Sequence, residues 1–148
     1  MKKLIILSLS LLSFFGLNAQ QQNPITWVAS YKSISATEGE IIITPKIEKG
    51  WHSYSQKVTA DGPVPTSFKF TESKQYTLIG AVEECNVHEE FDKAFDAKIF
   101  VVTDKSSFKQ KVKFAKGGFN VTFKLEFMCC NDQMCLPPKT TELTVKVQ

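Results

Sequence analysis

The chain has 148 residues and a formal net charge of +3, and 43% of its residues are hydrophobic. That length suits one domain of ordinary size. Every basic residue is a lysine, and without Lys2 and Lys3 the 16 basic residues nearly balance the 15 acidic ones. This balance excludes the electrostatic footprint of a nucleic-acid-binding protein and a polybasic membrane patch.

The N-terminus has the pattern of a secretory signal peptide. A short basic start, Met1-Lys2-Lys3, precedes an apolar run over residues 4–15 that is broken only by serines, and Ala19 offers a small residue before a cut. The run is shorter than the roughly 18 apolar residues expected of a membrane span. We therefore predict a signal peptide over residues 1–19 and one mature domain over residues 20–148, exported to an oxidising compartment without membrane insertion. Disulfides persist in that compartment.

Most of the mature part alternates apolar and polar residues over short runs separated by turn residues. Such alternation indicates half-buried β-strands. We expect strands over residues 25–29, 40–47, 67–70, 76–79, 98–102, 108–114, 119–127 and 141–147. No stretch has the pattern of an amphipathic helix, so the sequence predicts an all-β fold, a sandwich of two sheets.

Three details add to this pattern. Pro45 suggests a bulge or an edge position within its strand. After Gly50, His52 and Tyr54 are two residues apart and point to the same side of a strand. Residues 83–96 are acidic, and we predict a long solvated loop there, with room for a helical turn.

Three of the four cysteines lie within seven residues, between two alternating runs that we predict to form a β-hairpin. Continuing the alternation of residues 119–127 places Cys129 on the apolar face and Cys130 on the polar face. We therefore expect Cys129 to be buried and inert and Cys130 to be accessible, because thiols in apolar surroundings react poorly. Cys130 and Cys135 become the predicted working pair, at the tip of the hairpin. Pro137-Pro138 then fixes the backbone after Cys135.

Two other interpretations of these residues stay open. In the chain-entropy model the small Cys130–Cys135 ring is worth roughly 2 kcal/mol, whereas a bridge from Cys85 to the hairpin would be worth roughly 4 kcal/mol. A tip bridge is therefore a weak device for stability, although a structural disulfide in a secreted binding module remains an alternative. The soft ligands Cys130, Cys135, Met128 and Met134 would also suit Cu(I). His52 is either a packed strand histidine or a residue that lines the thiol site and tunes thiolate formation.

The hairpin residues Phe127-Met128-Cys129-Cys130-Asn131-Asp132-Gln133-Met134-Cys135-Leu136-Pro137-Pro138-Lys139 resemble the redox hairpin of the N-terminal periplasmic domain of the thiol:disulfide interchange protein DsbD. The segment Gly50-Trp51-His52-Ser53-Tyr54 is similar to that family's segment beside its active site. The resemblance implies an immunoglobulin-like β-sandwich, here as a stand-alone domain. It also implies a cap loop before residue 98, whose shielding aromatic is Phe95, with Phe91 as the second choice.

The same resemblance implies a function. Cys135 would attack a disulfide of the substrate, and Cys130 would resolve the mixed disulfide, with His52 and Tyr54 lining the site. The electrons would come from a thioredoxin-like protein or a membrane electron transporter and pass to oxidised periplasmic proteins. This protein-disulfide reductase chemistry calls for no cofactor and no metal.

Overall fold

The computed structural model describes residues 23–58 and 62–148. The predicted signal peptide, its cut site and Asp61 lie outside the described residues. Within the described ranges the chain forms ten β-strands and no helix. The strands are β1 (Ile25–Ser33), β2 (Glu38–Ile47), β3 (His52–Tyr54), β4 (Ser67–Phe70), β5 (Tyr76–Cys85), β6 (His88–Asp92), β7 (Ala97–Val102), β8 (Ser107–Phe114), β9 (Phe119–Cys130) and β10 (Cys135–Val147).

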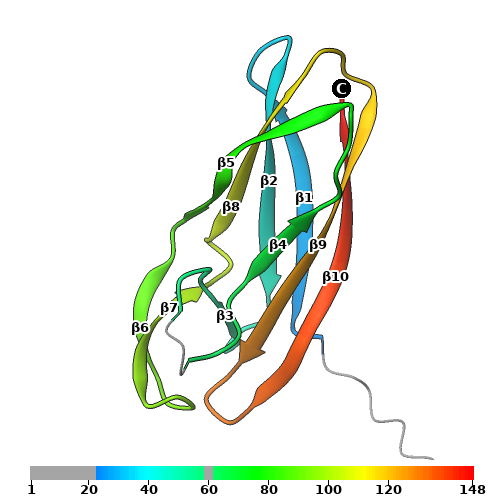
Figure 1. Ribbon diagram of the computed structural model, residues 1–148. Helices are drawn as coiled ribbons and strands as arrows, with labels where there is room; N and C mark the ends of the chain where they lie inside the picture. The colour runs from blue at the N-terminus through cyan, green and yellow to red at the C-terminus, as the bar shows by residue number, and fades with distance from the viewer. Residues whose placement is uncertain (1–22, 59–61) are drawn as a thin grey trace, which may run out of the picture.

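The strands form two antiparallel sheets that pack face to face, which confirms the predicted all-β sandwich (Figure 1). One sheet has the order β1-β2-β8-β5. The other has the order β10-β9-β3-β7-β6, and β4 pairs with β9 beside β3. The tip of the β9–β10 hairpin and the turn between β6 and β7 lie at the end of the molecule opposite the C-terminus (Figure 1).

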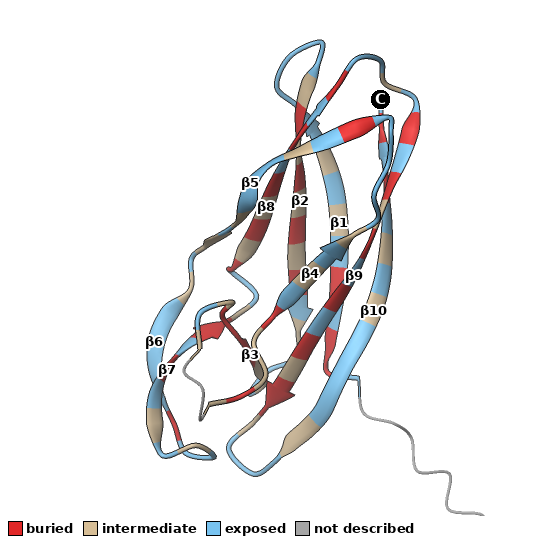
Figure 2. Cartoon of the chain, viewed as in Figure 1, coloured by how far each residue is buried: buried red, intermediate tan, exposed pale blue. Residues whose placement is uncertain are grey.

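The main core fills the space between the sheets. Alternate residues of β2, β8 and β9 point into it, so burial alternates along these strands (Figure 2). Phe108 is fully buried there and lies against Trp27 and Phe68, with ring centroids 5.8 and 5.0 Å away. The predicted apolar faces of the strands over residues 25–29, 108–114 and 119–127 all point to this core.

A second, smaller core lies at the end of the molecule that carries the hairpin tip. It consists of Tyr54, Ile99, Val101 and Cys130, and partly buried side chains pack against it, namely Val58, Phe95, Ala97, Met128 and Cys135. We call this set the tip cluster. The predicted working pair of cysteines therefore belongs to a hydrophobic cluster separate from the main core.

The prediction for residues 83–96 was wrong. Strand β5 continues to Cys85, and β6 follows over His88–Asp92, so the acidic segment forms an edge strand and a tight turn. The first four residues of β6 are exposed on both faces, which removed the alternation that reveals a half-buried strand. Charged residues are common on edge strands because they discourage pairing with other chains.

Strand β5 is also longer than expected, and its middle explains why. The register with β8 shifts between Ile79 and Glu83, and Gly80 has a φ of 67°. The buried Gln110 side chain fills this irregularity by donating to the carbonyl oxygens of Ile79 and Gly80 at 3.1 and 3.4 Å. Gly80 directly follows the predicted strand over residues 76–79, and it lies in a bulge within β5 rather than at its end. The pairing of β2 with β8 ends at Ile43, so among the described residues β2 has no partner on that side at Pro45, which lies opposite Trp27 of β1 on the other side. This is the edge position, one of the two that we predicted for Pro45.

We predict that Phe108→Ala destabilises the protein by about 3–5 kcal/mol, because it opens a cavity in the main core. Urea unfolding measures the change. Phe100→Ala is the matched control, since Phe100 is 44% exposed and its loss should cost no more than about 0.5 kcal/mol. Equal losses for the two variants would contradict this assignment of the core.

Candidate functional site

The hairpin extends to the cysteines themselves. Cys130 ends β9, Cys135 begins β10, and the two are directly opposed and joined by a disulfide. Asn131 shapes the four-residue loop between them, because its side-chain oxygen accepts hydrogen bonds from the amides of Gln133 and Met134, both at 2.9 Å. The Asn131 amide also donates to the Met134 carbonyl at 2.9 Å. The predicted Cys130–Cys135 pairing is thus present in an ordered tip.

The proline pair follows the disulfide on the edge strand β10, whose one partner strand among the described residues is β9. The register of the two strands shifts between Leu136 and Lys139, at the position of Pro137-Pro138. Prolines lack an amide donor, so an irregularity on an edge strand is where they cost least.

The two adjacent cysteines differ less in burial than their alternation suggested. Cys129 is 5% exposed and lies in the main core, as predicted, and burial raises the pKa of its thiol although Lys139 partly opposes the shift. Cys130 is 0% exposed, so the prediction that it is accessible was wrong. Here β3 pairs with β9, and the tip cluster covers the face that alternation marks as polar. Cys135 is only half-buried and is the more accessible end of the disulfide.

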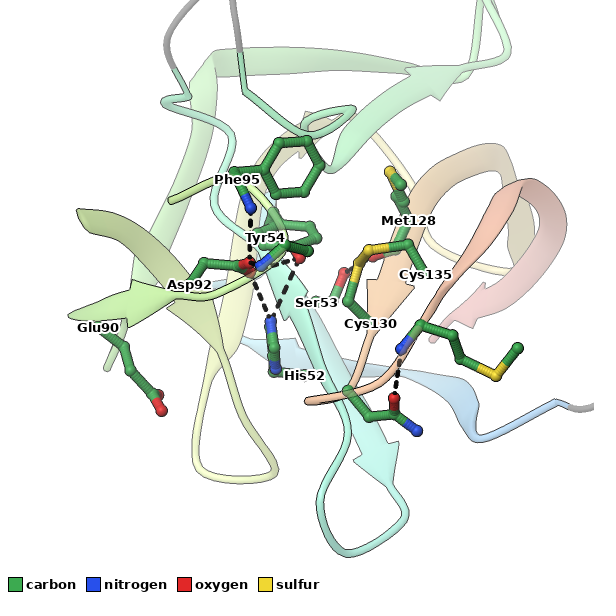
Figure 3. Close-up of polar contacts among 12 residues, drawn as sticks. His52, Ser53, Tyr54, Glu90, Asp92, Phe95, Met128, Cys130 and Cys135 are labelled. Carbon is green, nitrogen blue, oxygen red and sulfur yellow. Dashed lines mark hydrogen bonds and ion pairs between the residues drawn. A yellow bond between two sulfur atoms is a disulfide. The ribbon is translucent and has the colours of Figure 1, made fainter. Parts of the chain in front are cut away.

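Strand β3 supplies the wall of the site. His52 lies opposite Cys130 and Ser53 lies opposite Cys129 in the pairing with β9. The Ser53 hydroxyl donates to the carbonyl of Met128 at 2.8 Å, which secures this short strand. Gly50 precedes it with a φ of 85°, a left-handed conformation that favours glycine. His52 and Tyr54 point to the same side, as predicted, with the His52 Nε2 atom 3.3 Å from the Tyr54 hydroxyl (Figure 3).

Asp92 is the site residue that the sequence analysis missed. It is 5% exposed at the end of β6, and its Oδ2 atom lies 2.7 Å from the Tyr54 hydroxyl and 3.0 Å from His52 Nε2 (Figure 3). Its Oδ1 atom accepts from the amides of Ala94 and Phe95, at 2.8 and 3.3 Å. It belongs to the acidic run over residues 83–96, for which the sequence predicts a solvated loop, and nothing in the local sequence separates it from its exposed neighbours.

These contacts set the ionisation of the site. Burial disfavours the Asp92 carboxylate, but the hydrogen bonds from Tyr54, His52 and the two amides outweigh it and hold the pKa of Asp92 below its usual value. Burial raises the pKa of Tyr54, and the neighbouring Asp92 raises it further. The tyrosine therefore stays protonated and donates to a charged acceptor, which is a strong kind of hydrogen bond.

The two candidate cap residues differ in position. Phe95 lies in the turn between β6 and β7, residues 93–96, which we call the cap turn. It packs against the tip cluster, and its ring meets Tyr54 edge-on with centroids 6.0 Å apart (Figure 3). Phe91 is 55% exposed. Phe95, and not Phe91, therefore belongs to the cluster that contains the two disulfide-bonded cysteines.

The cap turn also contacts the hairpin loop. Lys93 Nζ lies 3.2 Å from Asp132 Oδ2, and both side chains are exposed. A cavity of about 240 Å³ lies beside this ion pair, lined by residues that include Trp51, His52, Glu90 and Asp92. The site therefore has an open flank beside His52 and Asp92.

The fourth cysteine is set apart from the others. Cys85 ends β5 opposite Ser107 in the four-stranded sheet, and it is half-buried and unpaired. Among the described residues, no group of three or more His, Cys, Asp and Glu side chains is arranged to hold a metal ion. Within the same ranges, no helix is long and apolar enough to cross a membrane.

Comparisons with known proteins agree on one family. The sequence matches the family described as "Thiol:disulfide interchange protein DsbD, N-terminal" over residues 21–147. No curated protein sequence matches significantly.

Solved structures show the same fold at low sequence identity. The N-terminal periplasmic domain of ScsB from Proteus mirabilis is 17% identical with a TM-score of 0.55, and the match covers 82% of this chain but only 45% of that one. The reduced DsbD N-terminal domain of Neisseria meningitidis is 17% identical with a TM-score of 0.48, over 81% of this chain and 84% of that one. The same domain in a complex with the PilB N-terminal domain is 17% identical with a TM-score of 0.46, over 80% of each chain. The family match and the likeness to the ScsB domain, together with the two packed sheets, confirm the predicted immunoglobulin-like sandwich.

We predict that iodoacetamide modifies Cys85 well before Cys129 in the folded, oxidised protein. Cys129 is buried and its pKa is raised, so its thiolate is scarce and shielded, whereas Cys85 is half-buried. Peptide mapping by mass spectrometry measures both rates, and unfolding in urea should equalise them. Rapid labelling of Cys129 without urea would contradict its placement in the main core.

The lowered pKa of Asp92 predicts how stability depends on pH. A depressed folded pKa contributes stability that is present above the unfolded value, about 3.9, and is lost as pH falls through the folded value. The difference in unfolding free energy between wild type and Asp92→Asn should therefore shrink as pH falls from 5 to 2. Urea unfolding at each pH measures it. A difference that stays constant over this range would show that the Asp92 charge does not contribute.

Proposed function

The chain belongs to the family of thiol:disulfide interchange protein DsbD N-terminal domains, and we propose that it exchanges disulfides with other proteins through Cys130 and Cys135. Thiol–disulfide interchange is supported at the level of the family. The observation that carries the proposal for this chain is the Cys130–Cys135 disulfide at the hairpin tip, beside His52 and Tyr54. The further steps below concern this chain alone.

The reaction is a two-step exchange. In the reduced protein, the Cys135 thiolate attacks one sulfur of the substrate disulfide, and the other substrate sulfur leaves as a thiolate and takes up a proton. Cys130 then attacks the mixed disulfide at Cys135, which forms the Cys130–Cys135 bond and releases the second substrate thiol. Two electrons pass from the protein to the substrate, and no cofactor takes part.

The difference in exposure supports this division of roles. Cys135 is half-buried, whereas Cys130 is 0% exposed and packed in the tip cluster. The sulfur that meets a second protein must be reachable, and the resolving sulfur needs to reach only Cys135. Cys135 is thus the attacking residue and Cys130 the resolving residue.

His52 and Tyr54 line the buried side of the pair, and both are held by Asp92. A fixed wall keeps water and other nucleophiles from the buried sulfur. Phe95 covers the pair from the cap turn, and we propose that the cap turn moves aside when a partner docks. Phe91, at the rim of the cavity, is then free to contact that partner.

The electrons come from a thioredoxin-like protein or a membrane electron transporter and pass to oxidised periplasmic proteins. The N. meningitidis relative forms a complex with the PilB N-terminal domain, and the P. mirabilis relative is described as periplasmic. We assign the same compartment to this chain, reached through the predicted signal peptide over residues 1–19.

We predict that Cys130→Ser accumulates mixed disulfides through Cys135, because the resolving thiol is missing. Expression with the signal sequence, acid quenching and mass spectrometry of the trapped species measure them. Cys135→Ser is the matched control and should trap far fewer, since the remaining Cys130 is buried. Background species alone in both variants would contradict the exchange proposal.

The reduction potential separates exchange from a structural bridge. Structural disulfides of secreted proteins have potentials below about −300 mV, and exchange-active pairs lie higher. Equilibration with glutathione buffers measures the potential of the Cys130–Cys135 pair. A value below that limit, together with no trapped partners, would favour the structural alternative.

A further inference from the structure

The two oxygens of the Asp92 carboxylate face different parts of the molecule. Oδ2 is bonded to Tyr54 and His52 on β3, which is the fixed wall of the site. Oδ1 is bonded to the amides of Ala94 and Phe95, which belong to the cap turn. The carboxylate is therefore the buried link between the wall and the turn that covers the disulfide.

The position of Phe95 depends on this link. Its amide is one of the two donors to Oδ1, and its ring packs edge-on against Tyr54, which donates to Oδ2. The ring belongs to the same cluster as Cys130 and Cys135. If Oδ1 releases the amides, the backbone that holds Phe95 in the tip cluster, with Cys130 and Cys135, loses its buried anchor.

A second contact holds the cap turn from outside, but it is weaker. The Lys93–Asp132 ion pair joins the cap turn to the hairpin loop, with side chains 67% and 81% exposed. Exposed ion pairs contribute little, because water and salt screen them. Hydrogen bonds from amides to a buried carboxylate are stronger, and salt screens them much less. Asp92 therefore dominates the closure.

We propose that Asp92 is a positioning residue for disulfide exchange: it holds the cap turn closed over the Cys130–Cys135 pair and so limits which reagents reach the sulfurs. This inference rests on the proposed function, because a covered disulfide needs a gate only if it reacts. Substituting Asp92 frees the cap turn from β3, so reagents that do not dock on the protein gain access to the disulfide.

The test uses a small reductant, tris(2-carboxyethyl)phosphine. The phosphorus attacks one sulfur of the disulfide and the sulfur–sulfur bond breaks. Water then supplies the oxygen of the phosphine oxide and the protons of the two thiols. Two electrons move from phosphorus to the sulfur pair, and no protein partner is needed. The rate therefore reports access to the Cys130–Cys135 bond whether or not the chain exchanges disulfides with proteins.

Asp92→Asn is the main variant. An amide has a single acceptor oxygen, so either the wall or the cap turn loses its acceptor. We expect reduction at pH 7 to be at least about tenfold faster than in wild type, the factor that corresponds to about 1.4 kcal/mol. Glu90→Gln is the matched control: it removes the same charge two residues away, from the rim of the same cavity, and Glu90 makes no bond to the cap turn among the described residues. It should react within about twofold of wild type.

The pH profile tests the carboxylate itself. The titratable groups around Asp92 are His52 and Tyr54 from β3, Glu90 from β6, Lys93 from the cap turn and Asp132 from the hairpin loop. Relative to oxidised glutathione at the same pH, reduction of wild type and Glu90→Gln should speed up as Asp92 becomes protonated, at a pH lower than an unperturbed aspartate requires, because its pKa is lowered. Asp92→Asn should lack this rise. A purely structural role would not remove it.

Two outcomes would overturn the inference. One is a folded Asp92→Asn protein that reacts at the wild-type rate. The other is a faster rate that climbs steeply in low urea, since that dependence marks global unfolding and not a local opening. If Asp92→Asn fails to fold, Phe95→Ala, which removes the covering ring and leaves the carboxylate, must show the same acceleration or the inference fails. If Cys130→Ser traps no partners but Asp92→Asn is still reduced faster by the phosphine, the proposed function is wrong while the role of Asp92 in holding the cap turn is retained.

Discussion

The alternation of strand β9 is the constraint on which the site depends. Val121, Phe123, Leu125 and Phe127 point into the main core, and this fixes the orientation of every residue up to the end of the strand. Cys129 must then face the main core, and Cys130 must face away from it. A shift of one residue would exchange the two cysteines and expose the apolar side chains, so the core determines which thiol can join the disulfide.

What surrounds Cys130 depends on pairing between distant segments. β9 pairs with β4 along its middle and with β3 at its end, so its outer edge is covered all the way to the cysteines. The local pattern of the hairpin could predict the direction of Cys130 but not the presence of Tyr54, Ile99 and Val101 around it. For this reason the sequence predicts the pairing of Cys130 with Cys135 but not the burial of Cys130.

The same reasoning separates the other successes from the failures. Strands with one buried face, such as β8 and β9, are predictable because apolar and polar residues alternate along them. The common direction of His52 and Tyr54 is predictable from their spacing of two residues. β6 has no buried face over its first four residues, so its sequence lacks the alternation that predicts a strand. Asp92 is acidic like Glu89 and Glu90, but it stands at the end of β6, where the chain bends. The bend places its carboxylate between β3 and the cap turn. Sequence carries no signal for that contact, because its partners are about 40 residues away.

The division into two clusters reconciles a stable fold with a reactive bond. The main core does not include Cys130 or Cys135, and the ring that their disulfide closes is worth only about 2 kcal/mol in the chain-entropy model. Breaking the bond therefore removes little of the stability of the sandwich. Opening the cap turn disturbs the tip cluster alone, since Phe95 packs against no residue of the main core among those described. The proposed exchange would thereby be confined to one end of the molecule, where the paired strands β9 and β10 hold Cys130 and Cys135 opposite each other.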